Sequence, residues 1–591
     1  MSSQVGFLRT IGSSACPLQQ EQRSRERRLR LVPAPVTCRQ SQGGGGGGGD
    51  GLILDRRNVL LALGGAAATA TASSSKMVLA APVTPPDLSK CHDANASGLG
   101  DNLKCCPPYT SATVYDYEFP ATPLRVRRPA HLVKSDEEYM AKYKEAVKKM
   151  KELPENHPWN YYQQALIHCA YCNEAYDQVG YPNANVQVHF SWFFLPWHRY
   201  YLHFYERILG KLIDDDTFAL PYWNFDAEDG MNLPEIFTMD PTSSIYNDKR
   251  DKSHYYPAIV DYKYGYANTA GTGETGKDLV QANLSYMSKT FKDSLQLPEL
   301  FMGDPLRAGE ESEKGTGGLE TIHNALHQWV GPAESPHTDM GSFATAGRDS
   351  VFFCLHANVD RLWHLYRGFR GNKVEFNDPD WLESSFLFYD EDEKVVQVKI
   401  KDALSTTKLR YTYEEVPIPW MGRVSIKKKA ETKEKSTTEL SLVRVGEFGS
   451  QPRELGTSPL RVLVSRSKKN RKKAEKQDKV EVLQVKDIVV TSSGPARFDV
   501  YVAAPYGDLA GPDYGDFAGS FVKLPHTMNE KGKMPESGMK KKKKANLKLG
   551  LTSILEDIEA DDADKLVVTL VPRVGEITVG NVVDKLVLSN Y

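Results

Sequence analysis

The chain has 591 residues and a mass of 66.1 kDa, which is more than one ordinary domain. Apolar residues make up 40% and charged residues 25%, which fits a soluble globular protein and excludes a disordered or collagen-like chain. The net charge is −2, but residues 1–80 are basic, so the rest is acidic and lacks the basic footprint of a nucleic-acid-binding protein. The longest apolar run, near 59–72, is too short and too rich in Ala and Gly to span a bilayer, so we expect no integral membrane segment.

Residues 1–80 have the order of features that is typical of a targeting segment. Residues 1–50 are rich in arginine and poor in acidic side chains, and they contain a glycine run at 43–49 that cannot form a core. The arginine pair at 56–57 then precedes an apolar stretch and a small-residue cleavage site. This order predicts a bipartite transit peptide, with a chloroplast signal followed by a twin-arginine signal for the thylakoid lumen, and a mature chain that begins near Ala81. The alternative is a disordered extension with an accidental arginine pair.

The region that follows has mainly helical patterns. Residues 81–130 are rich in Pro and Cys and have little periodicity, so they predict an irregular arm. The polar, glycine-containing region 240–318 predicts long loops with short elements. Helical periodicity covers 135–151, 161–176, 196–212, 319–329 and 350–366. We therefore expect a mainly α core, a helical bundle with long loops.

The character of the sequence changes after Gly371. Segments with strand-like composition and turn residues between them lie at 394–400, 460–464, 480–490, 498–503, 566–571 and 576–579. The charged stretch 427–435 predicts a linker, and the lysine-rich runs 468–476 and 540–544 predict solvated loops. The sequence therefore predicts an antiparallel β domain at the C-terminal end.

Histidines give the first indication of chemistry. His323 and His327 are four residues apart, so a helix would place both imidazoles on one face, where they could bind a metal or simply line a surface. His356 lies in an apolar helical run and is expected to point into a core, where an imidazole needs a hydrogen-bond partner or a metal. Asp360, one turn further on, could orient a ligand or pair with Arg361.

A second group of histidines lies upstream. His168 is on a predicted helix, and His189 and His198 flank a dense aromatic segment. An aromatic core with polar edges is the alternative for this group. All-imidazole sites suit copper, zinc, iron or nickel, and a catalytic zinc site needs only one group of three. Two groups of three in an aromatic-rich helical core favour a pair of copper ions that hold dioxygen between them.

With these motifs, the sequence resembles the plant polyphenol oxidases of the tyrosinase and catechol oxidase family, which have a type-3 copper centre. The resemblance covers nearly the whole chain. It is carried by His168-Cys-Ala-Tyr-Cys172, Leu195-Pro-Trp-His-Arg199, His323-x-x-x-His327, His356-Ala-Asn-Val-Asp-Arg361, Asp380-Trp-Leu382, Tyr411-Thr-Tyr413 and Arg497-Phe-Asp-Val500.

The resemblance implies a set of ligands and covalent bonds. The first copper ion would be bound by His168, His189 and His198, and the second by His323, His327 and His356. Cys172 would form a thioether with His189. Disulfides would join Cys91 to Cys106 and Cys105 to Cys169, which leaves Cys354 as a buried free thiol.

The resemblance also implies roles beside the metal. Glu320 and Asn324 would hold a water near the second copper ion, as a candidate base for a phenolic proton, and Phe343 would lie over that copper ion. The sequence departs from many relatives at Leu355 and Ser350, and Gln328 lies where the family varies. These positions leave the six ligands intact and concern substrate preference.

The resemblance further implies a division into domains and an activity. The transit peptide 1–80 would be followed by a dicopper catalytic domain at 81–375, a middle region at 376–425, a linker at 426–455 and a shielding domain at 456–591. The implied activity is oxidation of o-diphenols to o-quinones with reduction of dioxygen to water, with monophenol hydroxylation as a second activity. The enzyme would be latent until a protease removes the C-terminal domain. Its partners would be small phenolic substrates, dioxygen and the protease, with no nucleic acid, and its oligomeric state is left open.

Three alternatives stay open. The same copper pair could carry dioxygen without turning over phenols. The enzyme could have a narrow biosynthetic role on one plant phenolic. The histidine groups could instead be structural zinc sites.

Overall fold

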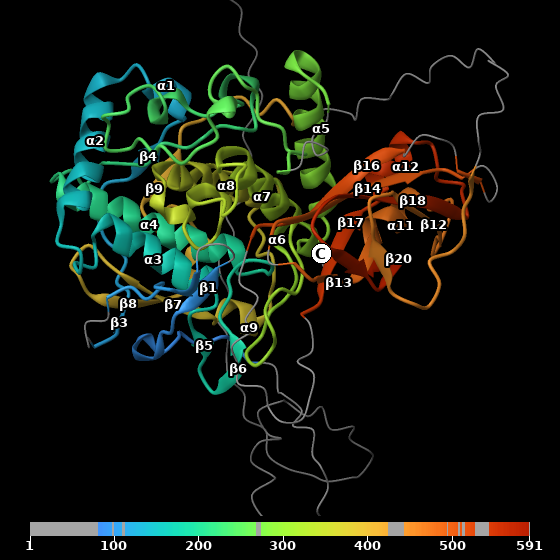
Figure 1. Cartoon of the computed structure of the whole chain (residues 1–591), viewed down its shortest axis with the longest axis horizontal. Helices are drawn as coiled ribbons and strands as arrows, with labels where there is room; N and C mark the ends of the chain where they lie inside the picture. Colours follow the sequence, from blue (N-terminus) through green and yellow to red (C-terminus); the bar gives the residue numbers. More distant parts are fainter. Residues whose placement is uncertain are drawn as a thin grey trace, which may run out of the picture. The chain divides into compact units, whose positions relative to one another are not determined.

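A computed structural model describes residues 81–96, 100–108, 113–266, 273–422, 443–492, 494–505, 509–510, 515–525 and 543–589 (Figure 1). These residues belong to one compact unit, Met77–Tyr591. The predicted transit peptide, the charged stretch 427–435 and the start of the lysine run at 540–544 lie outside the described residues.

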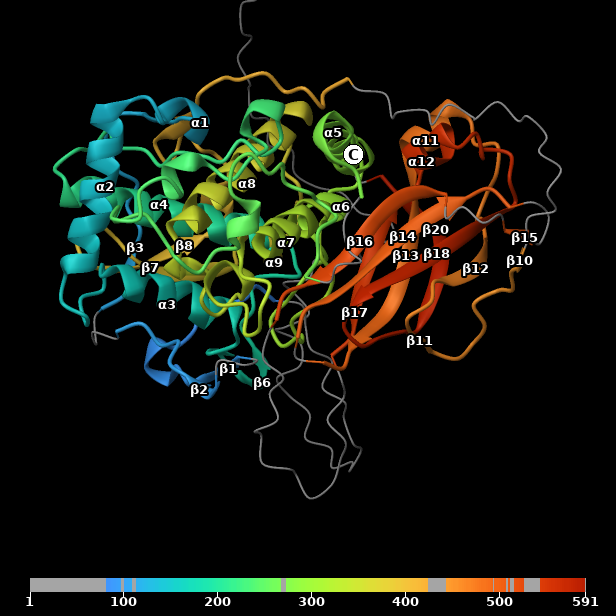
Figure 2. The ribbon, with the colours of Figure 1, turned by 45° about the horizontal axis from the view of Figure 1, so that its top comes forward.

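The N-terminal part of the described chain is helical, as predicted from periodicity. Its helices are α1 (Ala130–Val133), α2 (Glu137–Glu152), α3 (Tyr161–Cys172), α4 (Phe194–Leu212), α5 (Gly276–Ser294), α6 (Glu299–Met302), α7 (Gly318–Val330), α8 (Ser350–Phe369), α9 (Pro379–Leu382) and α10 (Ile400–Ala403). Figures 1 and 2 show α3, α4, α7 and α8 at the centre of this helical part. α4 packs on α8, and α8 also contacts α7.

Helix α5 corrects the prediction of long loops with short elements over 240–318. It spans 19 residues, and its buried residues recur at intervals of three and four, as an amphipathic helix requires. They include Leu279, Val280, Asn283, Leu284, Met287 and Phe291. Polar residues surround this apolar stripe in the sequence, so the composition of the segment indicates a loop.

Strands of the N-terminal arm pair with strands that follow α8 in the sequence. β3 (Tyr115–Asp116), β8 (Val395–Lys399) and β7 (Ser385–Tyr389) form a three-stranded sheet in that order. β4 (Arg125–Arg127) pairs in parallel with β9 (Tyr411–Tyr413). Two short pairs, β1 (Ala94–Ala96) with β2 (Gly100–Leu103) and β5 (Asp177–Gln178) with β6 (Tyr181–Asn185), complete this part.

The arm is also held by two disulfides. Cys91 is bonded to Cys106, and Cys105 is bonded to Cys169 on α3. These are the two pairs that the resemblance implies. Cys169 and Cys172 are spaced as a C-x-x-C, yet Cys169 takes its partner from the arm and leaves Cys172 as a buried thiol. Cys354 is the other buried free thiol among the described residues.

The C-terminal part is β-rich and antiparallel, as predicted. One sheet has the order β12 (Leu460–Ser465), β18 (Lys565–Val574), β14 (Ala496–Ala503), β16 (Asp516–Lys523). The second has the order β11 (Arg453–Leu455), β19 (Ile577–Val579), β13 (Lys479–Val490), β17 (Ala545–Gly550), and β20 (Asn581–Leu588) also pairs with β13. Apolar side chains of both sheets form one core.

The C-terminal part contains short strands and a short helix that the sequence does not predict. β10 (Val443–Arg444) pairs with β15 (Leu509–Ala510), and β11 pairs with β19, so the β-rich part includes residues from 443 onward. The lysine run 468–476 was expected to be a loop, but its end forms the short helix α11 (Lys473–Asp478). α12 (Thr552–Asp557) lies between β17 and β18.

In the described part of the chain, no helix has the combination of length and apolar character that a membrane span requires.

Candidate metal centre

Four central helices and the segment before α4 bring six histidines together. His168 lies on α3, His198 on α4, His323 and His327 on α7, and His356 on α8, while His189 precedes α4. Each is at most 2% exposed. Their nitrogen atoms form two groups within which possible ligand atoms lie no more than 4.8 Å apart: His168, His189 and His198 with the Cys172 thiol, and His323, His327 and His356. These are the two triplets that the sequence suggested.

Local structure explains how His189 reaches the first group. Phe190, the next residue, has a left-handed φ of 58°, which turns the chain toward α4. The turn is held on both sides: the Phe190 amide donates to Glu320 Oε1 at 2.8 Å, and its carbonyl accepts from the Gly315 amide at 3.0 Å. The start of α7 therefore positions a ligand that lies more than a hundred residues upstream.

Hydrogen bonds set the direction of five imidazoles. Nδ1 faces a backbone carbonyl in His168 (Phe343, 2.9 Å), His198 (Phe194, 2.8 Å) and His327 (Met340, 2.7 Å). In His189 and His323, Nδ1 faces the side-chain oxygens of Gln187 at 3.3 Å and Asn324 at 3.0 Å. A proton on Nδ1 leaves Nε2 as the free ligand atom.

The Nε2 atoms have no protein partner that would replace a metal. In His168, His189, His198 and His327, Nε2 is buried without a hydrogen bond. His323 Nε2 and His356 Nε2 lie 3.0 Å from one another. Buried polar atoms are normally satisfied, so four unpartnered Nε2 atoms, together with two that face only one another, fit bound metal.

The two groups are neighbours. The rings of His198 and His356, one from each group, stack with centroids 4.2 Å apart and planes 8° apart. Burial lowers the pKa of His198 to about 3 and that of His327 to about 4. Burial also lowers the pKa of His168, His189, His323 and His356 well below the ordinary value. The imidazoles are therefore neutral near pH 7, as metal ligation requires.

Family models match three consecutive parts of the chain. They are the common central domain of tyrosinase over residues 158–368, the polyphenol oxidase middle domain over 375–425, and the chloroplastic polyphenol oxidase C-terminal domain over 451–584. A chloroplastic polyphenol oxidase of Vitis vinifera is 42% identical over 583 residues, covering 95% of this chain and 93% of its own. The chain belongs to the plant polyphenol oxidase family.

Two further comparisons refine this result. A chloroplastic (+)-larreatricin hydroxylase of Larrea tridentata is 43% identical over 543 residues, with 89% of each chain covered. The solved structure of latent apple tyrosinase is 41% identical, with a TM-score of 0.71, and covers 80% of this chain and 100% of its own. The polyphenol oxidase family consists of copper oxidoreductases, and this chain is an enzyme of that class. The tyrosinase domain and the two histidine groups imply a dicopper centre.

The carboxylate of Glu320 is close to the metal centre but outside both groups. Glu320 and His323 have the Glu-x-x-His spacing that di-iron proteins use. Its Oε1 accepts from the Phe190 amide, however, and its Oε2 is buried without a partner. Burial raises the pKa of Glu320 well above its ordinary value. The metal groups of this polyphenol oxidase thus contain imidazoles and one thiol and no carboxylate, unlike the carboxylate-rich sites of di-iron proteins.

The resemblance places Asn324 beside a water near the second copper ion and Phe343 over that ion, whereas the structure shows Phe343 closer to the first histidine group. Asn324 Oδ1 lies 3.0 Å from His323 Nδ1, while its Nδ2 donates to the Val522 carbonyl of β16 at 3.1 Å. The Phe343 ring stacks on His189 of the first group at 4.0 Å and lies 6.4 Å from the ring of His327 of the second.

The structure corrects the expected role of Asp360. Arg361 does not pair with Asp360 but with Asp226 at 3.1 Å, and among the described residues no histidine is hydrogen-bonded to Asp360. Asp360 instead accepts from Arg199, Arg127 and the hydroxyls of Tyr411 and Tyr413. It therefore ties α8, which carries His356, to α4 and the β4–β9 pair.

Sequence reasoning missed the residues that orient the imidazoles. Gln187 and the carbonyls of Phe194, Met340 and Phe343 are of this kind. A glutamine two residues before a histidine could have been noticed, but carbonyl acceptors carry no signal in the sequence. Two residues of the motifs that carry the resemblance connect segments that are distant in sequence. Trp381 donates a hydrogen bond to the Trp192 carbonyl at 3.1 Å, and Arg497 of β14 donates one to the Tyr264 carbonyl of the helical part.

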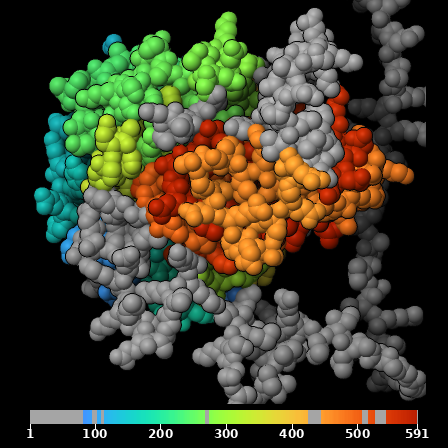
Figure 3. All heavy atoms as spheres, turned by 45° about the vertical axis from the view of Figure 1, so that its right-hand side comes forward, coloured from blue at the N-terminus to red at the C-terminus, as the bar shows by residue number. Residues whose placement is uncertain are grey.

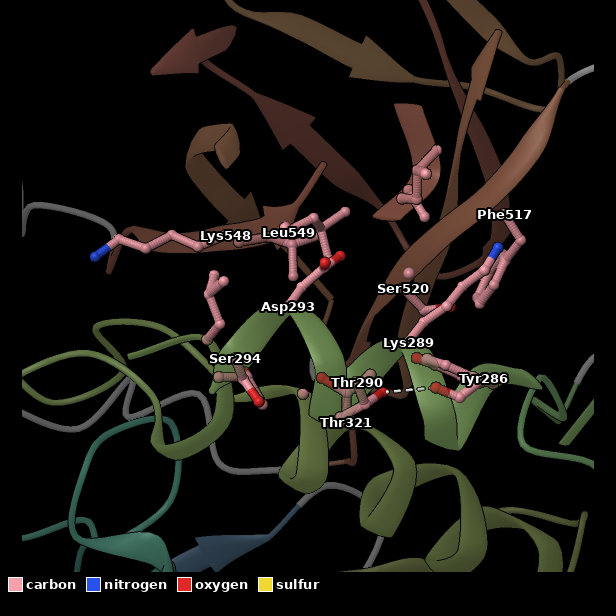
Figure 4. A pocket seen from close by; sticks show the side chains of 18 residues that line it. Tyr286, Lys289, Thr290, Asp293, Ser294, Thr321, Phe517, Ser520, Lys548 and Leu549 are labelled. Carbon is pink, nitrogen blue, oxygen red and sulfur yellow. Dashed lines mark hydrogen bonds between the residues drawn. The ribbon is translucent and has the colours of Figure 1, made fainter. Parts of the chain in front are cut away.

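The β-rich part lies against the helix that carries His323. β16 contacts α7, and Leu524, which follows it, is fully buried in the apolar cluster of the helical part. Figure 3 shows orange and red atoms of the β-rich part directly against green atoms of the helical part. A small cavity of about 50 Å³ lies elsewhere in this interface, between α5, α7, β16 and β17, with Lys289, Asp293 and Phe517 in its wall (Figure 4).

Proposed function

We propose that the six histidines bind two copper ions, His168, His189 and His198 one of them and His323, His327 and His356 the other. The observation that carries this proposal is that six buried Nε2 atoms converge, four of them without a partner and two facing only one another. The bound copper pair would supply the dioxygen-binding and redox chemistry. Cys172, whose thiol lies within 4.8 Å of the ligand atoms of the first group, would be bonded to His189 as a thioether.

We further propose that the enzyme oxidises o-diphenols to o-quinones. Two diphenols would lose four electrons and four protons in total, and one dioxygen would become two waters. The protein's part is to hold the imidazoles, exclude water and receive the phenolic proton. Glu320 Oε2 is a buried carboxylate oxygen without a partner close to the centre, and it would be the acceptor for that proton.

Phenol hydroxylation would use the same groups. Glu320 and Asn324 would hold a water that takes the proton of a monophenol. In the described chain the Asn324 amide donates to Val522, so this role requires β16 to move away. Phe343 would guide the aromatic ring, because it already stacks on His189.

We propose that the β-rich part keeps the enzyme latent. Three consecutive residues of the β-rich part contact the helical part: Val522 accepts a hydrogen bond from Asn324, Lys523 pairs with Glu313, and Leu524 is buried among the side chains of the helical part.

Residues 1–80 would be a transit peptide to the chloroplast and the thylakoid lumen. The catalytic domain would be 81–375, the middle region 376–425, the linker 426–455 and the shielding domain 456–591. Because β10 and β11 of the linker pair with strands of the β-rich part, the activating protease would act before Val443.

A narrower function is the second candidate. The similar Larrea tridentata protein is named a (+)-larreatricin hydroxylase, so close relatives include enzymes named for one phenolic. Gln328, directly after His327, is buried and neither its Oε1 nor its Nε2 has a partner. Such a side chain is available to recognise a specific substrate, and a panel of plant mono- and diphenols would separate the two candidates.

Oxygen uptake by copper-loaded 81–591 tests the proposal. Catechol would be the substrate, before and after limited proteolysis in the 425–455 region, and bound copper would be measured in parallel. Two copper ions per chain and uptake that rises after cleavage are expected. High uptake before cleavage would contradict latency alone. Two copper ions without uptake on any phenol would indicate dioxygen carriage, and two zinc ions in the purified protein would overturn the copper proposal.

A further inference from the structure

We propose that Glu313 and Phe190 form a subsite for the ammonium group of amine-bearing diphenols, and that Lys523 fills this subsite in the latent enzyme. The inference rests on the proposed phenol oxidation. It adds a substrate class to that proposal: phenols with an aliphatic ammonium arm are favoured over phenols with a carboxylate arm.

The subsite adjoins the metal centre through Phe190. This residue follows His189 directly, and its ring lies 6.2 Å from the His189 ring and 5.9 Å from the Phe343 ring. Glu313 lies in the loop before α7, and the Gly315 amide of the same loop donates to the Phe190 carbonyl at 3.0 Å. Glu313 is therefore carried by a loop that is bonded to the neighbour of a metal ligand.

The occupant of the subsite is a cation from the other end of the chain. Lys523 Nζ lies 2.7 Å from Glu313 Oε2 and 5.8 Å from the centre of the Phe190 ring. Both charged side chains are buried, at 6% and 3% exposure. A carboxylate and an aromatic face on one ammonium group are the contacts by which proteins recognise cationic ligands.

Lys523 belongs to the segment that covers the centre. It is the last residue of β16, between Val522, which accepts from Asn324, and the buried Leu524. When this segment leaves, Glu313 loses the Lys523 ammonium but keeps its place beside Phe190. The same surface that admits the phenol ring would then offer a carboxylate to the arm of the substrate.

A second carboxylate strengthens the charge of this rim. Lys543 Nζ contacts Glu174 and lies 4.0 Å from Glu313 Oε1. Removal of the β-rich part takes away both lysines and leaves both carboxylates. An acidic rim attracts a cationic substrate and repels an anionic one, and this preference weakens with added salt.

The test compares two diphenols that differ in the charge of the arm. Dopamine and 3,4-dihydroxyphenylacetate are assayed with the copper-loaded chain after the limited proteolysis, and catechol serves as the neutral reference. We expect kcat/KM to be higher for dopamine, and we expect Glu313→Gln to lower the dopamine-to-carboxylate ratio about fivefold with catechol unchanged, because an exposed ion pair is worth up to about 1 kcal/mol. An unchanged ratio in Glu313→Gln would overturn the proposal.

Two further variants separate charge from structure. Glu313→Asp keeps the charge and should retain most of the ratio, whereas a loss equal to that of Glu313→Gln would point to packing and contradict the subsite. Glu311→Gln removes an exposed carboxylate from the same loop and should leave the ratio unchanged. An equal loss in this control would show a general field instead of a subsite. Equal copper content in all variants confirms that they fold.

A binding measurement makes the inference independent of turnover. Calorimetry with 2-phenylethylamine, which lacks oxidisable hydroxyls, should show binding to the cleaved chain that weakens about fivefold in Glu313→Gln. Binding of the amine without oxygen uptake on any phenol would contradict the proposed function and support the subsite. Oxygen uptake on catechol with no binding of the amine would support the proposed function and overturn the subsite.

Discussion

The side chain of Gln187 connects a histidine of the metal centre to the end of α3. Its Oε1 lies 3.3 Å from His189 Nδ1, and its Nε2 donates to the Cys172 carbonyl at 2.6 Å. The side-chain amide of Gln187 is held by the Cys172 carbonyl through its nitrogen, and its oxygen in turn sets the direction of the His189 imidazole. Residues that orient metal ligands in this way contribute to metal affinity although they do not touch the metal.

Replacement of Gln187 by alanine should weaken copper binding. We expect a loss of about tenfold in affinity for the first copper ion, because an unoriented His189 ligates less well. Competition with a copper chelator measures the effect. Gln163→Ala removes a glutamine whose amide bonds an exposed carbonyl, so it serves as the control and should leave copper affinity unchanged.

The contribution of Asp360 to the stability of the fold depends on the negative charge of its carboxylate. Burial alone would raise the pKa of Asp360, but Arg199 and Arg127 hold it below its ordinary value of 3.8. A carboxyl with a lowered pKa stabilises the fold at pH above its unfolded value, and this contribution is lost as the pH falls through the folded value. The contribution of Asp360 is therefore fully present at neutral pH.

The Asp360→Asn variant should be strongly destabilised near pH 7. Buried Arg199 would lose its carboxylate partner and buried Arg127 one of its two, which costs about 3 kcal/mol or more in the free energy of unfolding. Urea unfolding of both proteins measures the difference, which should shrink below pH 4, where Asp360 of the unfolded chain becomes protonated. Asp392→Asn, at an exposed position, is the control. A difference that stays constant down to pH 3 would refute this account.

At the scale of elements, α8 depends on its first residues. Asp349 precedes the helix, its Oδ1 accepts from the Val351 amide at 2.8 Å, and it forms a fully buried ion pair with Arg250. One carboxylate thus begins the helix that carries His356 and ties it to the loop that contains Arg250. The cap and the ion pair can be separated by substitution.

Asp349→Asn should keep the cap and lose the ion pair, while Asp349→Ala should lose both. We expect Asp349→Ala to be less stable than Asp349→Asn by about 1 kcal/mol, the usual value of an N-cap. Both should lose about 3 kcal/mol or more relative to the wild type, since Arg250 would be buried without its partner. Thermal unfolding with circular dichroism gives both differences, and equal stability of the two variants would exclude the cap.

At the scale of the whole molecule, the helical and β-rich parts share an interface with charged pairs around an apolar contact. Lys548 of β17 pairs with Glu299 and with Asp304, the latter at 2.8 Å, and Ser553 of α12 donates to Asp293. Leu524 adds a fully buried apolar side chain in the apolar cluster of the helical part. Stability of this interface would set the degree of latency.

Leu524→Ala should make the uncleaved enzyme partly active. Truncation of a buried leucine costs about 2 to 5 kcal/mol, and here most of this cost falls on the contact between the two parts. Oxygen uptake on catechol without proteolysis measures the effect. Leu566→Ala lies in the core of the β-rich part alone and should destabilise that part, so equal activation by both variants would indicate unfolding instead of release.

Periodicity and spacing determined much of this protein from the sequence. The helices that carry His168, His198, His323, His327 and His356 follow from apolar residues at intervals of three and four, and the β-rich part follows from alternation. The resemblance named both disulfide pairs, although Cys105 and Cys169 are 64 residues apart in the sequence. Helix α5 was missed because its narrow apolar stripe lies in a polar segment, where local composition outweighs periodicity.

The tertiary structure decided the relations between segments that are distant in sequence. No local pattern shows that Asp360 binds Arg199 and not Arg361, that Asn324 donates to Val522, or that Glu313 holds Lys523. The sequence by itself determined the residue types, the helices and the two histidine triplets, because these depend on neighbours along the chain. The partners of the buried charges depend on how helices and sheets pack, and only the folded chain brings those groups within hydrogen-bonding distance.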